Sequence, residues 1–333
     1  MEHRVLGTSG VRVSVVCVGT ATFGVAPAER DAVELVHRAL DWGVNFFDTA
    51  NTYGNQARFD RPGALPADRR KSAEEILGRA LAGRRDDVVL ATKVSEAVGH
   101  GPNDGGFGGG GLTRLHIMRE VEHSLRRLGT DYIDVYHAHH PDPLTPIDET
   151  MRAFDDLVRA GKVRYAALST FPAWQTMEAL WACDRLGLSA PVCNQVMYNL
   201  VTRGVETELV PACLRTGLSL TVFSPLAAGL LAGAAAVARP VSGWRRFGAA
   251  LDYPNEQLAQ ARELDGLAEE WGVPSSQLAL HWVLTRPAVA SVVVGAESVV
   301  ELESAVAATT LALDEDQLAR LDAVGRPAPP FPF

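Results

Sequence analysis

The sequence predicts an α/β fold: a single (β/α)8 TIM barrel with an N-terminal hairpin, extra helices and long loops at its C-terminal face. Short runs of β-branched residues alternate with longer stretches in which apolar residues recur at helical spacing. The composition does not change along the chain, so residues 1–333 are expected to form one domain. A doubly wound sheet is the alternative, but Val18-Gly19-Thr20-Ala21 is not the glycine fingerprint that such a sheet carries on its first strand.

Five strands and their helices are predicted in the first half of the chain. A hairpin-like segment, Arg4 to Leu6 followed by Thr8-Ser9-Gly10, precedes them. The strands are expected near residues 13–19, 45–50, 88–94, 132–139 and 163–169, and the helices near 28–42, from Ser72 onward, and near 113–128, 147–160 and 173–186. Ser72-Ala73-Glu74-Glu75 offers an N-cap hydroxyl followed by acidic residues, which is typical of a helix start.

Three further strands, near residues 192–196, 218–223 and 290–295, complete the predicted barrel. Helices are expected near 205–216 and 275–284, with an extra helix near 255–271 and final helices near 299–307 and 315–324. Three long loops, 55–71, 95–112 and 230–254, follow strands at the C-terminal face, where function collects in this fold. Loops of this length often form lids or substrate walls.

The bulk composition argues against several classes of function. The net charge is −9 and there is no long run of Lys or Arg, so the basic footprint of a nucleic-acid-binding protein is missing. No stretch is long and apolar enough to span a membrane, and the N-terminus lacks the apolar core of a secretory signal. The cysteines, Cys17, Cys183, Cys193 and Cys213, lie among apolar neighbours and not at metal-ligand spacing, which favours buried reduced thiols in a cytoplasmic protein.

Four polar residues lie at or just after the ends of successive predicted strands. Asp48 ends the run Asn45-Phe46-Phe47-Asp48 and Tyr53 follows it, Lys93 ends the next strand, and His139 ends the one after. Because strand ends meet at one face of a barrel, a carboxylate, a phenol, an ammonium and an imidazole are expected to lie together. Such a cluster suits proton transfer to an oxygen that gains negative charge.

Tyr53 is the candidate acid of this cluster. A free phenol has a pKa of about 10, and lowering it to about 7 requires roughly 4 kcal/mol. One cation about 4 Å away supplies about that amount at an effective dielectric of about 20. We therefore expect Lys93 to lower the pKa of Tyr53, Asp48 to keep Lys93 charged, and His139 to donate toward the same oxygen.

Two other motifs point to different chemistry. His137, His139 and His140 resemble the histidine pairs of metal-dependent hydrolases, but the further ligands are lacking because Asp184 and His281 fall within predicted helices, and no metal site is predicted. The segment Gly106-x-Gly108-x-x-Gly111 matches a dinucleotide fingerprint only formally, since no strand directly precedes it. We expect a flexible loop there.

The strand ends carry a family resemblance. Asp48-Thr49-Ala50-Asn51-Thr52-Tyr53-Gly54, Ala91-Thr92-Lys93-Val94 and the segment from Asp131 to Asp142 resemble the signatures of the aldo-keto reductase family, closest to its bacterial, potassium-channel-β-like branch. Leu168-Ser169-Thr170-Phe171, Gln195 to Leu200 and Phe223 to Leu231 match in the family order. The resemblance runs from about Leu6 to Leu321, and it implies a (β/α)8 barrel, a nicotinamide cofactor and a small-molecule carbonyl substrate.

By position, the resemblance assigns Asp48, Tyr53, Lys93 and His139 to a catalytic tetrad, with Tyr53 as the general acid of carbonyl reduction. It also implies that Ser169, Thr170 and Gln195 hold the carboxamide of the cofactor and that Phe223 stacks on the nicotinamide ring. The remaining cofactor-binding positions that it implies are Gly19, Thr20, Ala21, Asp48, Ser224, Pro225, Leu226, Gly229, Arg245, Gly295, Glu297 and Glu301.

Several positions depart from the family pattern. Thr170 stands where Asn is usual, and the segment from Gly295 to Ala305 lacks the usual Arg and terminal Asn. Glu297 and Glu301 lie near the expected place of the adenosine 2′-phosphate and would repel it unless Arg245 or Arg246 compensated. NADP(H) is the expected cofactor because it is usual in the family, and NAD(H) is the alternative.

The expected function is the NADPH-dependent reduction of an aldehyde or ketone to an alcohol. A tailoring reductase for natural products or sugar nucleotides is an alternative that the resemblance implies, because related enzymes reduce activated double bonds or keto-sugars. The loop that contains Arg58, Arg61, Arg69 and Arg70 either meets a phosphorylated substrate or is a solvated basic loop. A nicotinamide-binding regulatory subunit is another alternative. His139 argues against the last, since channel-associated relatives carry Asn at that position.

Overall fold

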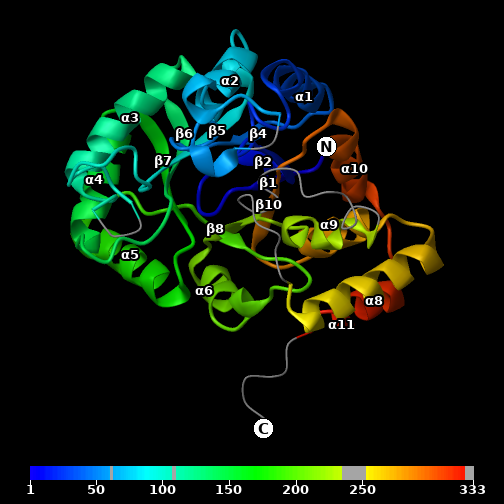
Figure 1. Cartoon of the computed structure of the whole chain (residues 1–333). Coiled ribbons are helices and arrows are strands. Elements are labelled where there is room, and N and C mark those ends of the chain that lie inside the picture. The colour runs from blue at the N-terminus through cyan, green and yellow to red at the C-terminus, as the bar shows by residue number, and fades with distance from the viewer. Residues whose placement is uncertain (61–62, 107–109, 235–252, 327–333) are drawn as a thin grey trace.

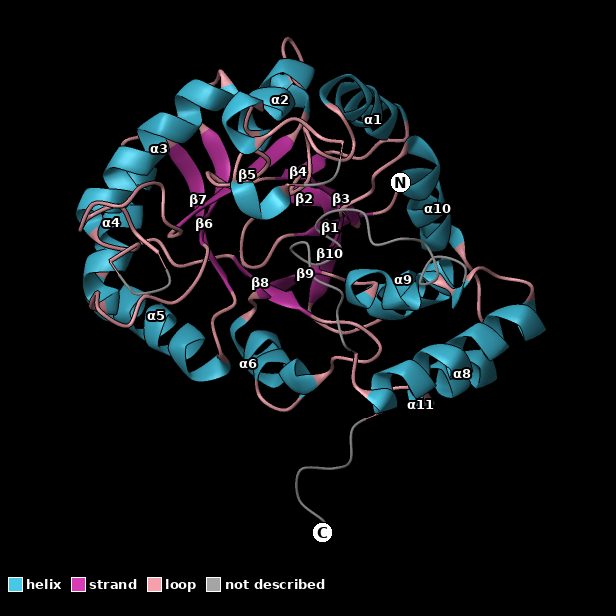
Figure 2. Cartoon of the chain, viewed as in Figure 1, coloured by secondary structure: helices cyan, strands magenta, loops and turns pink. Residues whose placement is uncertain are grey.

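Eight parallel strands close into a barrel that is surrounded by helices (Figure 1, Figure 2). The computed structural model describes residues 1–60, 63–106, 110–234 and 253–326. The barrel strands are β3 (Val16–Gly19), β4 (Phe46–Asp48), β5 (Val89–Val94), β6 (Ile133–Ala138), β7 (Val163–Ser169), β8 (Cys193–Met197), β9 (Ser219–Phe223) and β10 (Val289–Val294). Each strand pairs with the next in sequence and β10 closes on β3, which confirms the predicted TIM barrel.

Side chains of the strands alternate between the barrel interior and the helix layer. Phe46, Ala91 and Val135 belong to the apolar cluster inside the barrel, whereas Phe47 and Leu90 pack against the helices. Two residues further along each strand, the inward positions become polar while staying buried: they are Asp48, Lys93, His137, Ser169 and Gln195. The period of two therefore places a polar layer on top of the apolar interior, at the C-terminal end of the strands.

Helices cover the outside of the barrel. They are α1 (Glu29–Asp41), α2 (Ala73–Ala80), α3 (Arg114–Leu128), α4 (Ile147–Arg159), α5 (Ala173–Leu186), α6 (Leu209–Thr216), α8 (Asn255–Trp271), α9 (Ser275–Leu284), α10 (Val299–Ala307) and α11 (Glu315–Ala323). Ser72 caps α2 in a capping box with Glu75, as the sequence predicts for this helix start. Most expected boundaries agree with the structure to within two residues.

The first predicted strand, residues 13–19, is wrong at its start. Residues Arg12–Ser14 form β2, which pairs antiparallel with β1 (His3–Val5), and the barrel strand begins only at Val16. Leu6 and Val13 are fully buried in the inner apolar cluster, so the hairpin covers the N-terminal end of the barrel. Arg4 Nη1 donates to the carbonyl oxygens of Leu284 at 2.8 Å and Val289 at 2.9 Å, which ties the hairpin to the last strand.

The helix predicted at 205–216 begins later than expected. A short 3₁₀ helix, Gly204–Glu206, precedes α6. Pro211 explains the difference, because proline lacks a backbone N–H and is tolerated only in the first turn of a helix. A helix beginning near 205 would have placed this proline in its interior.

The three long loops leave the C-terminal ends of β4, β5 and β9. The first contains short 3₁₀ helices at Ala57–Phe59 and Ala67–Arg69. Gly108 of the formal fingerprint and Trp244, Arg245 and Arg246 of the third loop lie outside the described residues. Among the residues that the structure describes, no helix is long and apolar enough to cross a membrane.

Candidate active site

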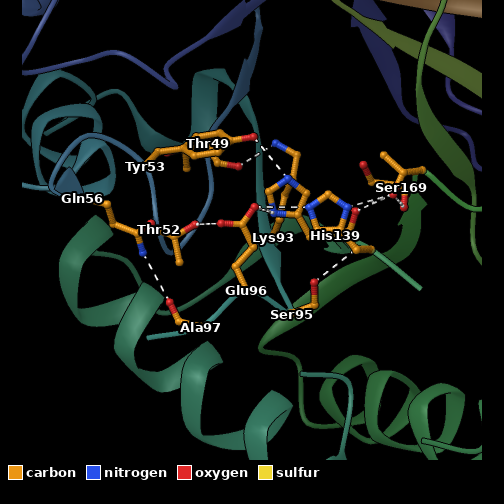
Figure 3. Close-up of polar contacts among 12 residues, drawn as sticks. Thr49, Thr52, Tyr53, Gln56, Lys93, Ser95, Glu96, Ala97, His139 and Ser169 are labelled. Carbon is orange, nitrogen blue, oxygen red and sulfur yellow. Dashed lines mark hydrogen bonds and ion pairs between the residues drawn. The ribbon is translucent and has the colours of Figure 1, made fainter. Parts of the chain in front are cut away.

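The four strand-end residues come together at the C-terminal face of the barrel. Figure 3 shows three of them, Tyr53, Lys93 and His139. The Lys93 ammonium donates to Asp48 Oδ1 and, at 2.9 Å, to the carbonyl oxygen of Thr49. The phenol oxygen of Tyr53 lies 3.3 Å from His139 Nε2, and Lys93 Nζ lies 4.9 Å from the centre of the Tyr53 ring. The structure thus brings the carboxylate, phenol, ammonium and imidazole into one cluster.

Asp48 and Lys93 form a buried ion pair. The Lys93 side chain is fully buried, and only 3% of the Asp48 side chain is exposed. Gln195 Nε2 donates to the second carboxylate oxygen of Asp48 at 2.8 Å. Burial opposes the charge of Lys93, but Asp48 and Tyr53 outweigh it and raise the pKa of the lysine above its ordinary value. Lys93 therefore stays a cation at neutral pH.

The pKa of Tyr53 is raised, so the expectation that Lys93 would lower it below its ordinary value is wrong. Burial has the largest effect because it disfavours the phenolate; Lys93 lowers the pKa, and Asp48 raises it. The expectation treated Lys93 as a lone cation, whereas the phenol is desolvated and faces an ion pair. Tyr53 consequently stays protonated at neutral pH and carries a proton that it can donate.

A buried glutamate that the sequence analysis did not select lies behind the two histidines. Glu96 follows β5 by two residues, and 7% of its side chain is exposed. Its Oε2 atom accepts hydrogen bonds from Arg58 and from Thr52 Oγ1, the latter at 2.8 Å, while Oε1 lies 3.2 Å from His140 Nε2. Burial opposes its charge, yet His140, His139 and Arg58 lower the pKa of Glu96 far below its ordinary range. The only sequence signal for it is its place three positions after Lys93.

His139 and His140 stack on each other in front of this carboxylate. Their ring centres are 4.4 Å apart and their planes differ by 11°. Burial, with help from Lys93, holds the pKa of His139 well below its ordinary value, so its imidazole is neutral at neutral pH. His137 points elsewhere: it is fully buried, and its Nδ1 lies 3.1 Å from the Leu168 carbonyl oxygen.

The metal hypothesis meets a geometric obstacle at this place. In the described part of the chain, ligand atoms of Glu96, His139 and His140 lie within 4.8 Å of one another. A metal ion lies close to the plane of each imidazole that binds it, since the nitrogen lone pair lies in that plane. Two rings that stack with an 11° difference do not share such a point. The geometry favours a hydrogen bond between the carboxylate and His140, with His139 Nδ1 3.8 Å from the same oxygen.

Ser169, Thr170 and Gln195, the residues expected to hold a carboxamide, lie side by side at the ends of β7 and β8. Ser169 pairs with Gln195 in the strand register, and the Thr170 N–H donates to the Gln195 carbonyl oxygen at 2.8 Å. Thr170 has a φ of 58°, a left-handed conformation that Asn adopts more readily than a β-branched residue. Its hydroxyl oxygen lies 3.0 Å from His140 Nδ1, which links this patch to the histidines.

An aromatic face borders that polar patch. Phe223 ends β9, where it is half-buried and lies next to Met197 in the strand register. A cavity of about 500 Å³ opens beside it and is also lined by Thr170, Phe171 and Leu209. The chain then passes through Ser224, Pro225, Leu226 and Gly229, with left-handed φ values of 50° at Ser224 and 96° at Gly229. An aromatic face beside amide and hydroxyl groups fits a nicotinamide ring with its carboxamide.

The residues expected under the cofactor lie at the end of β3. Gly19 pairs with Asp48 in the register, and a Cβ at Gly19 would lie 2.7 Å from a methyl carbon of Val293. Thr20 Oγ1 donates to the Asp48 carbonyl oxygen at 3.0 Å, so this hydroxyl holds two strand ends together. Ala21 is half-buried just beyond it.

The expected adenosine end lies between β10 and α10. Gly295 follows β10, and the Glu297 N–H donates to Glu301 Oε2 at 2.9 Å. The Glu301 N–H donates in turn to Ser298 Oγ at 3.2 Å, so side chains of the segment itself cap α10. A carboxylate therefore lies at the helix N-terminus, where a phosphate would otherwise be favoured. Arg245, the expected compensating cation, lies outside the described residues.

The arginines of the first long loop are mostly engaged inside the protein. Arg58 pairs with Glu96 and lies 5.0 Å from the centre of the Phe59 ring. Arg70 is buried and donates to the Gly54 carbonyl oxygen at 2.8 Å and to Asp60 at 2.6 Å. Arg69 is exposed, and Arg61 lies outside the described residues. The case for a phosphorylated substrate loses Arg58 and Arg70, because both charges already have partners.

Comparison with known proteins agrees with the barrel fold. The model of the Aldo/keto reductase family matches residues 15–326. The chain is 37% identical to the uncharacterized oxidoreductase YrpG of Bacillus subtilis, over 97% of this chain and 95% of that protein. It is 38% identical to a probable voltage-gated potassium channel subunit beta of Arabidopsis thaliana, over 89% and 87% of the two chains. It is also 34% identical to the aldo-keto reductase AMT2 of Alternaria alternata, over 98% and 92%. The chain therefore belongs to the aldo/keto reductase family of oxidoreductases.

Proposed function

We propose that this protein is an NADPH-dependent reductase that converts an aldehyde or a ketone into an alcohol. The Tyr53 hydroxyl carries the proposal, because it lies 3.3 Å from His139 Nε2 with the Lys93 cation 4.9 Å from its ring centre. A bound nicotinamide would supply the hydride that attacks the carbonyl carbon. Tyr53 would donate its proton to the carbonyl oxygen, and in the reverse direction the phenolate would take it back.

The neighbours of Tyr53 support this proton transfer in different ways. The Lys93 cation stabilises the negative charge that develops on the phenol oxygen as the proton leaves. Asp48 keeps Lys93 charged and fixes its ammonium group. His139, which is neutral, lies beside the phenol and would orient the carbonyl oxygen toward it. The raised pKa of Tyr53 keeps the acid loaded until substrate binds.

Replacement of Tyr53 by Phe tests the proposal. The variant removes the transferable proton and little else, so turnover of 4-nitrobenzaldehyde with NADPH is expected to fall by at least about 100-fold while the cofactor still binds. Tyr132→Phe is the matched control, because Tyr132 precedes β6 at the opposite end of the barrel and its hydroxyl donates to Asp86. Turnover in Tyr53→Phe equal to that of the control would remove Tyr53 from the mechanism.

We assign NADPH because it is the usual cofactor of the family. The carboxylate that caps the N-terminus of α10 favours NADH instead, because it occupies the position where the 2′-phosphate of NADPH is expected. Quenching of tryptophan fluorescence, titrated with both cofactors side by side, separates them. If NADH binds more tightly than NADPH, the proposed cofactor becomes NADH. Glu301→Gln should then shift the ratio toward NADPH, because it removes a negative charge at the expected phosphate position.

A second candidate function comes from the relatives described as probable potassium channel subunits beta in Arabidopsis thaliana and rice. A nicotinamide-binding regulatory subunit would bind the cofactor and show little turnover. Steady oxidation of NADPH with 4-nitrobenzaldehyde supports the reductase; tight binding without turnover of any tested carbonyl supports the regulatory subunit. Parallel assays with an enone and a keto-sugar would identify a tailoring reductase of the same family.

A further inference from the structure

Ser224 lies directly after β9 in a conformation that a residue with a side chain rarely adopts. Its φ of 50° is in the left-handed region, and Ala227 and Gly229 follow with φ values of 46° and 96°. This conformation costs free energy in any residue other than glycine, so it persists only where neighbouring groups hold it. The turn 224–229 directly follows Phe223, the aromatic face beside the polar patch, so its shape matters for the expected cofactor site.

The side chain of Asn199 holds the backbone of Ser224. Asn199 lies in the loop after β8, is fully buried, and donates from Nδ2 to the Ser224 carbonyl oxygen at 3.1 Å. The same carbonyl oxygen accepts the Ala227 N–H at 2.9 Å, so both of its lone pairs are engaged. One of these bonds belongs to the turn itself, and the other fixes the turn to a neighbouring loop.

The neighbours of Asn199 allow only one orientation of its amide. The Oδ1 atom accepts the Val201 N–H at 3.1 Å. If the amide were rotated by 180°, its NH₂ group would face that N–H and its oxygen would face the Ser224 carbonyl oxygen. Two hydrogen bonds would then be replaced by two repulsive contacts. The side chain of Asn199 therefore acts as a donor to Ser224.

The loop that contains Asn199 is anchored on the side away from the turn. The backbones of Asn199 and Thr202 exchange two hydrogen bonds, of 3.2 Å and 3.1 Å. Arg203, whose side chain is 6% exposed, pairs with Glu206. It also donates from Nη1 to the carbonyl oxygen of Asp322, in α11, at 2.7 Å. Asn199 is thus fixed independently of the turn that it holds.

A second side chain holds the same turn near its other end. The hydroxyl of Tyr253, two residues before α8, donates to the Ala227 carbonyl oxygen at 3.1 Å. The carbonyl oxygens of two left-handed residues, Ser224 and Ala227, are therefore each held by a side chain from another segment. A ligand that binds such a turn finds it already formed, so the cost of ordering it does not reduce the affinity.

We propose that Asn199 is a positioning residue that fixes the turn 224–229 in the shape that binds the cofactor. This inference rests on the proposed function insofar as the ligand is a nicotinamide cofactor. Asn199 is fully buried and acts through the Ser224 carbonyl oxygen, without touching the cofactor itself. Without this hydrogen bond Ser224 relaxes from the left-handed region, and the turn must be ordered again when the cofactor binds.

The first test measures the turn in the protein without cofactor, by amide hydrogen exchange. In Asn199→Leu, whose side chain has nearly the same shape but no donor, the Ala227 N–H should exchange at least about fivefold faster than in the wild type, about what one hydrogen bond contributes. Asn45→Leu is the matched control. Asn45 accepts the Ser14 N–H at 2.7 Å and donates to the Arg12 carbonyl oxygen at 3.0 Å, at the opposite end of the barrel. The control should leave exchange at Ala227 unchanged.

The second test switches the donor with pH. In Asn199→Asp one carboxyl oxygen keeps the Val201 N–H and the other faces the Ser224 carbonyl oxygen, so the bond to Ser224 exists only while the carboxyl group is protonated. Burial raises the pKa of such a carboxyl group toward neutral pH. The oxidised cofactor, titrated by tryptophan fluorescence, should bind this variant within about twofold of the wild type at about pH 5.5 and at least about fivefold more weakly at about pH 8.5. The ratio of variant to wild type at each pH cancels the titration of groups that both proteins share, and Asn45→Asp should give a ratio independent of pH.

The two tests separate this inference from the proposed function. Equal exchange at Ala227 in Asn199→Leu and the wild type overturns the role of Asn199 in holding the turn, whatever the ligand is. If Asn199→Leu does not fold, exchange at Ala227 in Asn199→Asp, compared with the wild type at the two pH values, decides the same question. Cofactor affinity of Asn199→Asp that stays at the wild-type value at about pH 8.5 overturns the link to binding. Failure of the wild-type protein to bind either nicotinamide cofactor overturns the proposed function instead.

Discussion

Replacement of Lys93 by Met is expected to destabilise the protein strongly, for a reason separate from catalysis. The lysine side chain is fully buried and its main partner, Asp48, is 3% exposed. Met fills a similar volume but carries no charge. The carboxylate of Asp48 would keep only the hydrogen bond from Gln195, at 2.8 Å, and would be left as a buried charge without a counter-ion.

The expected loss of stability in Lys93→Met follows from the unpaired charge that Asp48 keeps. Removing one partner of a buried ion pair costs about 3–5 kcal/mol, because the remaining charge has lost both water and its counter-ion. For a chain of 333 residues the entropy of unfolding is about 0.7 kcal/mol/K, so the melting temperature should fall by about 4–7 °C. In Asp48→Asn/Lys93→Met no buried charge remains, and the double variant should recover at least about 1 kcal/mol of the loss.

Urea unfolding followed by circular dichroism, supported by thermal melts, measures these differences. The reasoning concerns the two charges together, so the decisive comparison is between the single and the double variant. If Lys93→Met stays within about 1 kcal/mol of the wild type, or if the double variant is less stable than Lys93→Met, the charge of Asp48 does not dominate the energetics of this site.

Three further predictions concern other buried and helical positions. Burial, aided by Lys93, lowers the pKa of His137 to about 4, so between about pH 6.5 and pH 4 the unfolded chain binds a proton that the folded protein does not. The free energy of unfolding should therefore fall by up to about 3 kcal/mol as the pH is lowered through that window. Urea unfolding should show a weaker fall in His137→Gln. Gly78→Ala should destabilise the protein by about 1–3 kcal/mol, because the added Cβ would lie 2.4 Å from the Leu128 carbonyl oxygen. Gly266→Ala, whose Cβ would have no atom within 4 Å, should stabilise the protein by up to about 1 kcal/mol. Equal effects of the two substitutions in thermal melts would contradict this. Glu74→Gln should lower the free energy of unfolding in urea by about 2–3 kcal/mol, because it weakens the buried hydrogen bonds to Arg127 and Thr92. The control Glu315→Gln, at an exposed position in the first turn of α11, should lower it by less than about 1 kcal/mol.

The sequence predicts those features of the fold that depend on local patterns. Alternation of strands and helices is local, and so is the period of two that places Asp48 and Lys93 on the inward side of β4 and β5. The barrel and its polar layer could therefore be anticipated from the order of residues alone. The N-terminal hairpin was also anticipated, but its second strand was not, because nothing in Val13–Gly19 indicates that Ser14 pairs outside the barrel; its partner, His3, lies in another segment.

Features of the site that depend on tertiary neighbours could not be predicted in the same way. Glu96 is in no motif, and its contacts with Arg58, Thr52 and His140 come from two other segments, those after β4 and β6. The pKa of Tyr53 was predicted in the wrong direction because burial and the compensation of Lys93 by Asp48 have no signature in the sequence. Charge balance and solvent access are properties of the assembled barrel.

The seam of the barrel has a consequence for how the chain is made. Val16 of β3 pairs with Val292 of β10, so one edge of the first barrel strand stays unpaired until the last strand has been made. At a synthesis rate of about 5–20 residues per second, the ribosome makes β10 roughly 14–55 s after β3. During that interval β3 and its growing sheet present an unpaired edge to other chains. Nascent molecules of this protein should therefore depend on chaperones until the final quarter of the chain has emerged.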